Sequence, residues 1–179
     1  RIENSQVAVY LAYAAPAGHA LIDRALYLPR AWIDDKARCA TAGIPENVGF
    51  ATKPQLAAAM VTRAVTAGAD ASWVTGDEVY GADPHLRQVI RGHRLGYVLA
   101  ISANRRLPTH AGKVRADQLT AKVPARAWQR LSAGQGSKGH RYYSWAQLPT
   151  DPDDPDDPDE YHLLVRRNDT TGEMAYYRC

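Results

Sequence analysis

Residues 72–81, SWVTGDEVYG, place an acidic pair directly behind an apolar run, and this stretch decides the predicted fold. The run over residues 71–75 has the length of a buried strand, and Gly76 allows the backbone to turn sharply after it. In sheets with parallel strands, ligands gather beyond the carboxyl ends of those strands. Asp77 is therefore expected to be presented to a binding site. The alternative is that Gly76 and Asp77 only make a turn, which the Asp77 side chain caps.

The segments on either side of this stretch show clear periodicities. Apolar residues alternate over residues 7–13, and a second run over residues 20–28 follows a ProAlaGly turn, which predicts a β-hairpin. Residues 29–53 are expected to form a long connection with one short helix. A longer helix is predicted from Pro54, which suits the first helical position, to Gly68, which ends it.

A second helix and a second strand are predicted after Asp77. Asp83 is the expected N-cap of this helix, Pro84 its first residue and Gly92 its end, and a strand follows at residues 97–102. The order of hairpin, helix, strand, helix and strand implies an α/β fold with a mixed sheet. A right-handed crossover would make the strands at 71–75 and 97–102 parallel.

Composition excludes several classes of protein. A chain of 179 residues fits one domain of ordinary size, and a mean hydropathy of −0.42 is that of a globular protein. No apolar run approaches the roughly 18 residues that span a bilayer, so no membrane association is predicted. Cys39 and Cys179 are too few and too far apart for a disulfide framework, which indicates a reducing, intracellular setting. The six histidines lack metal-ligand spacing and give a zinc site little support.

Charge is distributed unevenly along the chain, although its net value is only +3. The region from Arg91 to Arg141 contains a single acid, Asp117. The basic residues inside that region are Arg94, Arg105, Arg106, Lys113, Arg115, Lys122, Arg126, Arg130 and Lys138. Aromatic residues at positions 128, 142, 143 and 145 accompany these charges, which is typical of nucleic-acid contact. The alternative is a solvated, Arg-rich surface.

An acidic tract, DPDDPDDPDE at residues 151–160, follows the basic region. Its prolines remove backbone donors and restrict the residues before them, so it is expected to be an extended, solvated loop rather than a helix or a central strand. Cation binding is an alternative, but calcium loops need a Gly-centred turn and a distant Glu, and this tract has neither.

Several segments together resemble DDE-type bacterial insertion-sequence transposases. They are YLPRAWIDDKARCATAGIP, FATKPQLA, WVTGDEVYG, GHRYYSWAQLP and HLLVRRNDTTGEMAYYRC. This resemblance covers nearly the whole chain and implies a ribonuclease-H-like mixed sheet flanked by helices, with a basic, β-rich insertion. It assigns residues 1–104 to a partial catalytic core. Residues 105–179 would be the insertion subdomain, with a basic segment, the acidic loop 151–160 and a C-terminal hairpin.

The resemblance also implies a chemistry. Enzymes of this type hold two Mg²⁺ (or Mn²⁺) ions with three carboxylates, and Asp77 matches the second of these acids. The first would precede Arg1 and the third would follow Cys179, so the fold is expected to be incomplete and the chain to be a transposase fragment. A lone Asp binds Mg²⁺ weakly, and we therefore expect no strand cleavage by this chain alone. Glu78 is not expected to help, because on an extended segment its side chain would point away from that of Asp77.

The expected partners are DNA at insertion-sequence ends and a second transposase copy, in the nucleoid of a bacterial cytoplasm. By the resemblance, five basic residues of the insertion would contact the DNA backbone: Arg105, Arg106, Lys113, Arg115 and Arg141. Without its first strand, the sheet would also keep an open edge, which predicts aggregation or edge pairing.

Two other functions stay open. The chain could be a non-catalytic DNA-binding remnant or a repurposed domain. It could also be a different metal-dependent nuclease, in which Asp23, Asp34 or Asp35 joins Asp77 at a metal. Asp34 and Asp35 fit a helix start or a solvated turn better than a metal site.

Overall fold

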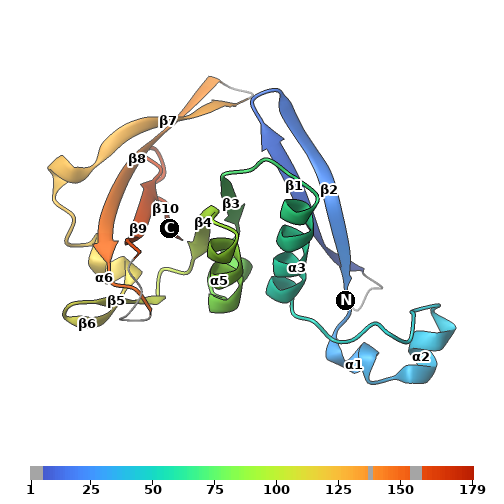
Figure 1. Ribbon diagram of the computed structural model, residues 1–179. Helices are drawn as coiled ribbons and strands as arrows, with labels where there is room; N and C mark the ends of the chain where they lie inside the picture. The colour runs from blue at the N-terminus through green and yellow to red at the C-terminus, as the bar shows by residue number, and fades with distance from the viewer. Residues whose placement is uncertain (1–5, 137–138, 154–158) are drawn as a thin grey trace. The chain divides into compact units, whose positions relative to one another are not determined.

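The computed structural model describes residues 6–136, 139–153 and 159–179, and in it the chain forms two compact units (Figure 1). The first unit combines Arg1–Ser72 with Asp83–Leu95, and the second combines Trp73–Ala82 with Gly96–Cys179. Helices and strands occur in both units, as expected for a mixed α/β protein. Within the described ranges, no helix is long and apolar enough to cross a membrane.

The first unit is a β-hairpin packed on helices. Strands β1 (Val7–Ala15) and β2 (Gly18–Tyr27) pair antiparallel, with an irregularity in register after Leu11, and this confirms the predicted hairpin. One face of the hairpin contacts helix α3 (Lys53–Thr66), and Val9 is almost completely buried there. In the described part of the chain, β1 and β2 form a two-stranded sheet of their own.

Capping residues fix the helices of this unit. The Thr52 hydroxyl and the Gln55 side chain form a capping box at the start of α3, and Asp83 caps α5 (Pro84–Gly92) by accepting a hydrogen bond from the Leu86 amide. Both predicted helices are thus confirmed. The two helices contact each other, and the buried apolar side chains on them are Ala58, Met60, Val61, Leu86 and Ile90.

The connection at residues 29–53 differs from the prediction of one short helix. It holds two, α1 (Arg30–Ile33) and α2 (Lys36–Thr41). Asp35 separates them because its carboxylate accepts a hydrogen bond from the Arg38 amide and so starts a new helix. Asp35 is thus a helix start, as one of the two interpretations predicted, whereas Asp34 is the C-cap of α1.

The second unit is built on a curled, six-stranded mixed sheet with the order β3-β4-β10-β9-β8-β7 (Figure 1). Its strands are β3 (Trp73–Gly76), β4 (Gly96–Ile101), β7 (Gln129–Gly136), β8 (Gly139–Thr150), β9 (Tyr161–Arg167) and β10 (Met174–Arg178). β3 and β4 are parallel, as predicted, and the other pairs are antiparallel. This mixed sheet is compatible with the ribonuclease-H-like fold inferred from the sequence.

One face of this sheet carries the core of the second unit. Ile101, Leu163 and Val165 project from it and pack with Leu107 and Ala116. Leu107 belongs to a small hairpin of β5 (Arg106–Thr109) and β6 (Gly112–Arg115), and Ala116 begins helix α6 (Ala116–Thr120). A short 3₁₀-helix (Ala125–Ala127) leads into β7.

The C-terminal hairpin of β9 and β10 confirms the strand pair predicted there. The acidic tract lies in the connection between β8 and β9, and its residues 154–158 are outside the described residues. Before them, the Asp153 carboxylate accepts a hydrogen bond of 3.0 Å from Nη1 of the buried Arg178, which lies 2.9 Å from the other carboxylate oxygen. This ion pair ties the start of the tract to the sheet.

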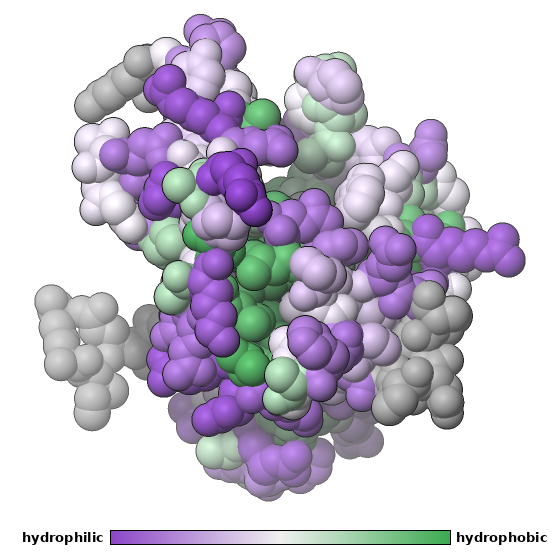
Figure 2. Space-filling model, turned by 90° about the vertical axis from the view of Figure 1, so that its left-hand side faces the viewer, coloured by the Kyte–Doolittle hydropathy of each residue, from purple (hydrophilic) through white to green (hydrophobic). Residues whose placement is uncertain are grey.

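On the face drawn in Figure 2, hydrophilic residues cover most of the surface and border a narrow hydrophobic strip.

Candidate active site

Asp77 lies immediately after β3, at the carboxyl end of a strand that is parallel to its neighbour. It is the N-cap of helix α4 (Glu78–Gly81), and its Oδ1 accepts a hydrogen bond of 2.9 Å from the Val79 amide. Asp77 thus caps a turn, as one of the two interpretations of the sequence proposed. An ionised carboxylate has about four acceptor positions, so one capping bond leaves Asp77 able to bind a further ligand. The side chain is exposed.

Two glycines set the position of Asp77. A Cβ on Gly81 would lie 1.9 Å from the backbone oxygen of Ala100, so only glycine allows α4 to lie directly against β4. A Cβ on Gly76 would meet Leu99 at 3.1 Å and Tyr80 at 3.3 Å. The TGDEVYG segment therefore places its acid by close backbone contact on both sides, whereas sequence alone indicated only a turn at Gly76.

Tyr80 stands one helical turn after Asp77 and is half-buried. Burial raises the pKa of the Tyr80 hydroxyl above its usual range, and the negative charge of Asp77 raises it further. The phenol is consequently neutral at physiological pH and remains a hydrogen-bond donor beside the carboxylate.

Glu78 does not lie on the extended segment assumed from the sequence. It is the first residue of α4, because the chain turns into a helix directly after Asp77. Successive residues of a helix do not face each other. The conclusion that Glu78 does not share a ligand with Asp77 stays a prediction, now for a different geometric reason.

The carboxylates of the alternative nuclease site are engaged elsewhere. Asp23 accepts two hydrogen bonds from the Arg63 guanidinium, at 2.7 and 3.0 Å, and these bonds lower the pKa of Asp23. Asp35 caps α2 and Asp34 ends α1. Among residues 6–136, 139–153 and 159–179, no three His, Cys, Asp or Glu side chains are grouped so that they could hold a metal ion.

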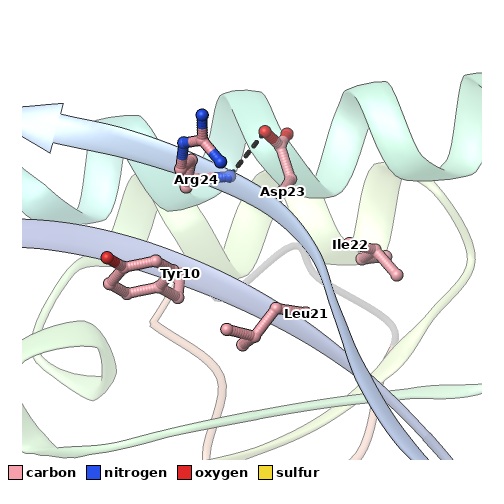
Figure 3. Close-up of a pocket in the computed structure, with 5 residues that line it drawn as sticks. All are labelled: Tyr10, Leu21, Ile22, Asp23 and Arg24. Carbon is pink, nitrogen blue, oxygen red and sulfur yellow. Dashed lines mark hydrogen bonds between the residues drawn. The ribbon is translucent and has the colours of Figure 1, made fainter.

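Two cavities of the first unit do not supply a metal site. A cavity of about 440 Å³ on the β1–β2 hairpin is lined by Tyr10, Leu21, Ile22, Asp23 and Arg24 (Figure 3). Its one carboxylate, that of Asp23, already binds Arg63 and accepts a further hydrogen bond from the Arg24 amide at 2.7 Å. A second cavity, of about 370 Å³, lies beside α2 and is lined by Lys36, Cys39 and Glu46, among others.

Four of the five predicted DNA contacts gather on the β5–β6 hairpin. Arg106 and Arg115 are directly opposite each other, Lys113 pairs with Pro108, and Arg105 immediately precedes β5. The Arg105 guanidinium also donates a hydrogen bond of 3.3 Å to the backbone oxygen of Ala82, at the end of α4. This bond links Arg105 to the C-terminal end of the short helix whose N-cap is Asp77.

Arg141 lies apart from the other four. It is near the first residue of β8, while the last residue of β8 adjoins β5, where the Asp151 amide donates to the Pro108 oxygen. About ten extended residues separate Arg141 from that contact, which is roughly 30 Å. The insertion therefore carries basic side chains at two separate places.

Arg115 is the least available of these cations. Its guanidinium donates to Asp117 at 2.6 and 3.1 Å, and this bidentate pair raises the pKa of Arg115 and lowers that of Asp117. The sequence signal was the single acid two residues after Arg115 in a basic region. Arg106 and Lys113 are exposed.

A family model of DDE superfamily endonucleases matches residues 1–152 of this chain. The chain belongs to this family. The resemblance to DDE-type transposases is thereby confirmed, and family membership implies transposase or nuclease activity, a DNA substrate and divalent-metal chemistry. A comparison with curated proteins found no match.

The described residues do not by themselves fit the two metal ions that such nucleases use. Two-metal sites need several carboxylates that bridge ions about 4 Å apart. Here Asp77 is an exposed single acid, with no other pair of metal-binding side chains grouped with it in the described ranges.

Proposed function

We propose that this DDE superfamily endonuclease chain is part of a transposase that cleaves and joins DNA at insertion-sequence ends, and that Asp77 is its catalytic, metal-binding carboxylate. One observation carries the proposal. An exposed carboxylate follows a parallel strand within the family match, and glycines on both sides fix its position. Such a placement is typical of ligand-binding residues in α/β sheets.

Basic residues on and beside the β5–β6 hairpin support a DNA substrate. Arg105 contacts the helix that Asp77 begins, and Arg106 and Lys113 are exposed on the adjoining hairpin. These side chains would neutralise phosphates of DNA whose scissile bond lies at Asp77. Arg115 and Arg141 complete the proposed set of backbone contacts.

The chain by itself is proposed to be inactive in strand cleavage. A Mg²⁺ ion is usually held by one or two carboxylates together with substrate phosphates, so Asp77 contributes only part of a site. Catalysis then requires carboxylates from outside the described residues. A second transposase copy and the bacterial nucleoid are the proposed partner and location, both as consequences of the DNA substrate.

The test measures DNA binding with and without Mg²⁺ for the whole chain and two charge-matched variants. Phosphates complete the Mg²⁺ site, so Mg²⁺ should tighten binding of a labelled duplex by the wild-type chain and by Glu78→Gln. It should not do so for Asp77→Asn. No strand cleavage is expected from any of the three proteins, with Mg²⁺ or with Mn²⁺.

Two results would contradict this proposal in different ways. If Asp77→Asn and the wild type respond identically to Mg²⁺, the carboxylate binds no catalytic metal, and a non-catalytic DNA-binding remnant is the better description. Robust cleavage that disappears in Asp77→Asn would show that the chain is a complete nuclease.

A further inference from the structure

Strands β7 and β8 continue beyond the six-stranded sheet as a two-stranded ribbon. β9 pairs with β8 only from Ser144 onward, whereas β7 pairs with β8 up to Gly136 and Gly139 (Figure 1). In the described ranges, residues 131–136 and 139–143 therefore have no third strand beside them. Nearly all of these residues are exposed, and the ribbon is about 20 Å long.

This ribbon belongs to an acid-free part of the chain. Residues 118–150 contain five Lys and Arg residues and no Asp or Glu. Its exposed apolar side chains, Leu131 and Tyr142, are 51% and 47% accessible, so the surface is both cationic and partly apolar. Such a surface suits a polyanion with apolar edges, which is the character of a DNA groove.

Arg130, which pairs with Ser144 at the base of the ribbon, and Arg141, within the ribbon, project from opposite faces of the β7–β8 strand pair. Arg130 lies over the ring of Tyr142, 4.7 Å from its centroid, and Tyr142 and Arg141 are successive residues of one strand, whose side chains alternate between faces. Arg141 is on the face of Gly136, where a Cβ would meet the Arg141 side chain at 3.1–3.4 Å. Each face of the strand pair thus presents one arginine.

Both arginines are held in place without being buried. The Arg130 side chain is 68% exposed, and its nearest acid is Asp169, at 3.8 Å. The Arg141 guanidinium donates to the Ala133 oxygen at 3.4 Å. A long ion pair at the surface is weak, so Arg130 keeps most of its capacity to bind a phosphate.

From this arrangement we propose that the β7–β8 ribbon lies in the major groove of duplex DNA, with Arg130 and Arg141 contacting the two sugar-phosphate backbones that border the groove. A ribbon resting on the outside of a duplex would need cations on one face, whereas a ribbon inside a groove meets phosphates on both sides. The major groove is about 12 Å wide and admits a two-stranded ribbon.

This inference rests on the proposed DNA function and specifies how the insertion binds its substrate. The test uses the whole chain without metal and measures the anisotropy of a fluorescent duplex of random sequence. Each phosphate contact contributes about 0.9 to the slope of log K against log salt. Arg130→Ala and Arg141→Ala should therefore each weaken binding roughly fivefold at about 0.15 M salt and lower the slope by about 0.9, and the effects of the two substitutions should multiply.

Groove-specific competitors identify the groove. Methyl green, which occupies the major groove, should displace the protein, and netropsin, which occupies the minor groove, should not. Lys36→Ala removes an equal charge from the first unit and should leave affinity unchanged. Thermal melting verifies the fold of each variant, and glutamine replaces alanine wherever an alanine variant melts early.

Three results would overturn the inference: unchanged affinity in both arginine variants, displacement by netropsin but not by methyl green, or tighter binding of single-stranded than of duplex DNA. The last result would mean that bases stack on the aromatic rings instead. The metal-free assay does not depend on Asp77. Unchanged affinity in the arginine variants would therefore not contradict the proposed role of Asp77. An absent Mg²⁺ effect would likewise not contradict DNA binding by the ribbon.

Discussion

At the scale of single residues, the surroundings of Asp77 include two residues that follow it by three and four positions. Tyr80 and Gly81 are on the helix that Asp77 caps, and Tyr80 shares its environment with the carboxylate. The raised pKa of Tyr80 has two causes, of which burial is the larger and the charge of Asp77 the smaller. These causes can be separated by removing the charge.

Asp77→Asn should lower the pKa of Tyr80 but leave it above its usual value of 10.0, because the burial remains. NMR of chains labelled at the tyrosine ring measures this, with Tyr80→Phe to assign the signal and Glu78→Gln as the charge-matched control. The folded state favours the neutral form of Tyr80, and this determines how the free energy of unfolding depends on pH. The contribution of Tyr80 is complete below pH 10 and is lost as the pH rises through the raised pKa. An unchanged Tyr80 titration in Asp77→Asn would show that the two groups do not interact.

At the scale of elements, the sequence predicted the helices whose ends are fixed by neighbouring residues. Pro54, Asp83 and Pro84 start helices through their own backbone and capping properties, so the sequence located α3 and α5 closely. Helix α4 was missed because four residues cannot show a helical period. The Arg115–Asp117 pair was also missed, although Asp117 is the single acid of the basic region and follows Arg115 by two residues. The turn from β6 into α6 brings the two side chains together.

The position of α4 depends on a contact between Gly81 and Ala100 that lies 19 residues away in sequence and that no local pattern reveals. Gly81→Ala should destabilise the second unit by about 1–3 kcal/mol, because the added methyl group overlaps a backbone oxygen. Gly92→Ala is the matched control: nothing lies within 4 Å of a Cβ at this helical position, so the free energy of unfolding should stay equal or rise by up to about 1 kcal/mol. Urea denaturation of both variants checks this, and equal stability of Gly81→Ala and wild type would show that α4 can move away from β4.

At the scale of the whole molecule, the sequence left open how the predicted strand pairs join into one sheet. The two hairpins and the parallel pair around Asp77 were predicted, but the pairing of β10 with β4 and of β8 with β9 was not. In the structure, β10 pairs with β4, so strands from both predicted regions of the chain share one sheet. The predicted boundary at residues 104 and 105, like the aggregation expected from an open edge, stays a prediction. β3 is an edge strand of the six-stranded sheet in the described residues.

The distribution of charge gives a divalent ion two places where it could bind. The basic side chains proposed to contact DNA lie on or beside the β5–β6 hairpin and the β7–β8 strand pair, and the tract at residues 151–160 holds seven Asp and Glu residues. Asp77 is outside that tract. A divalent ion added to the protein and DNA could therefore bind at Asp77 or at the acidic tract. Binding at Asp77 supports a catalytic carboxylate, and binding at the tract indicates nonspecific attraction of cations by clustered acids.

The most direct measurement is the paramagnetic broadening that Mn²⁺ causes in amide NMR signals of the whole chain bound to duplex DNA. If Asp77 holds the metal with DNA phosphates, the signals of Glu78 to Gly81 should broaden first, and Asp77→Asn should abolish that broadening. Broadening centred on Asp151 to Asp153 or on Asp35, unchanged in Asp77→Asn, would contradict the assignment of Asp77 as the metal-binding carboxylate of this DDE endonuclease chain.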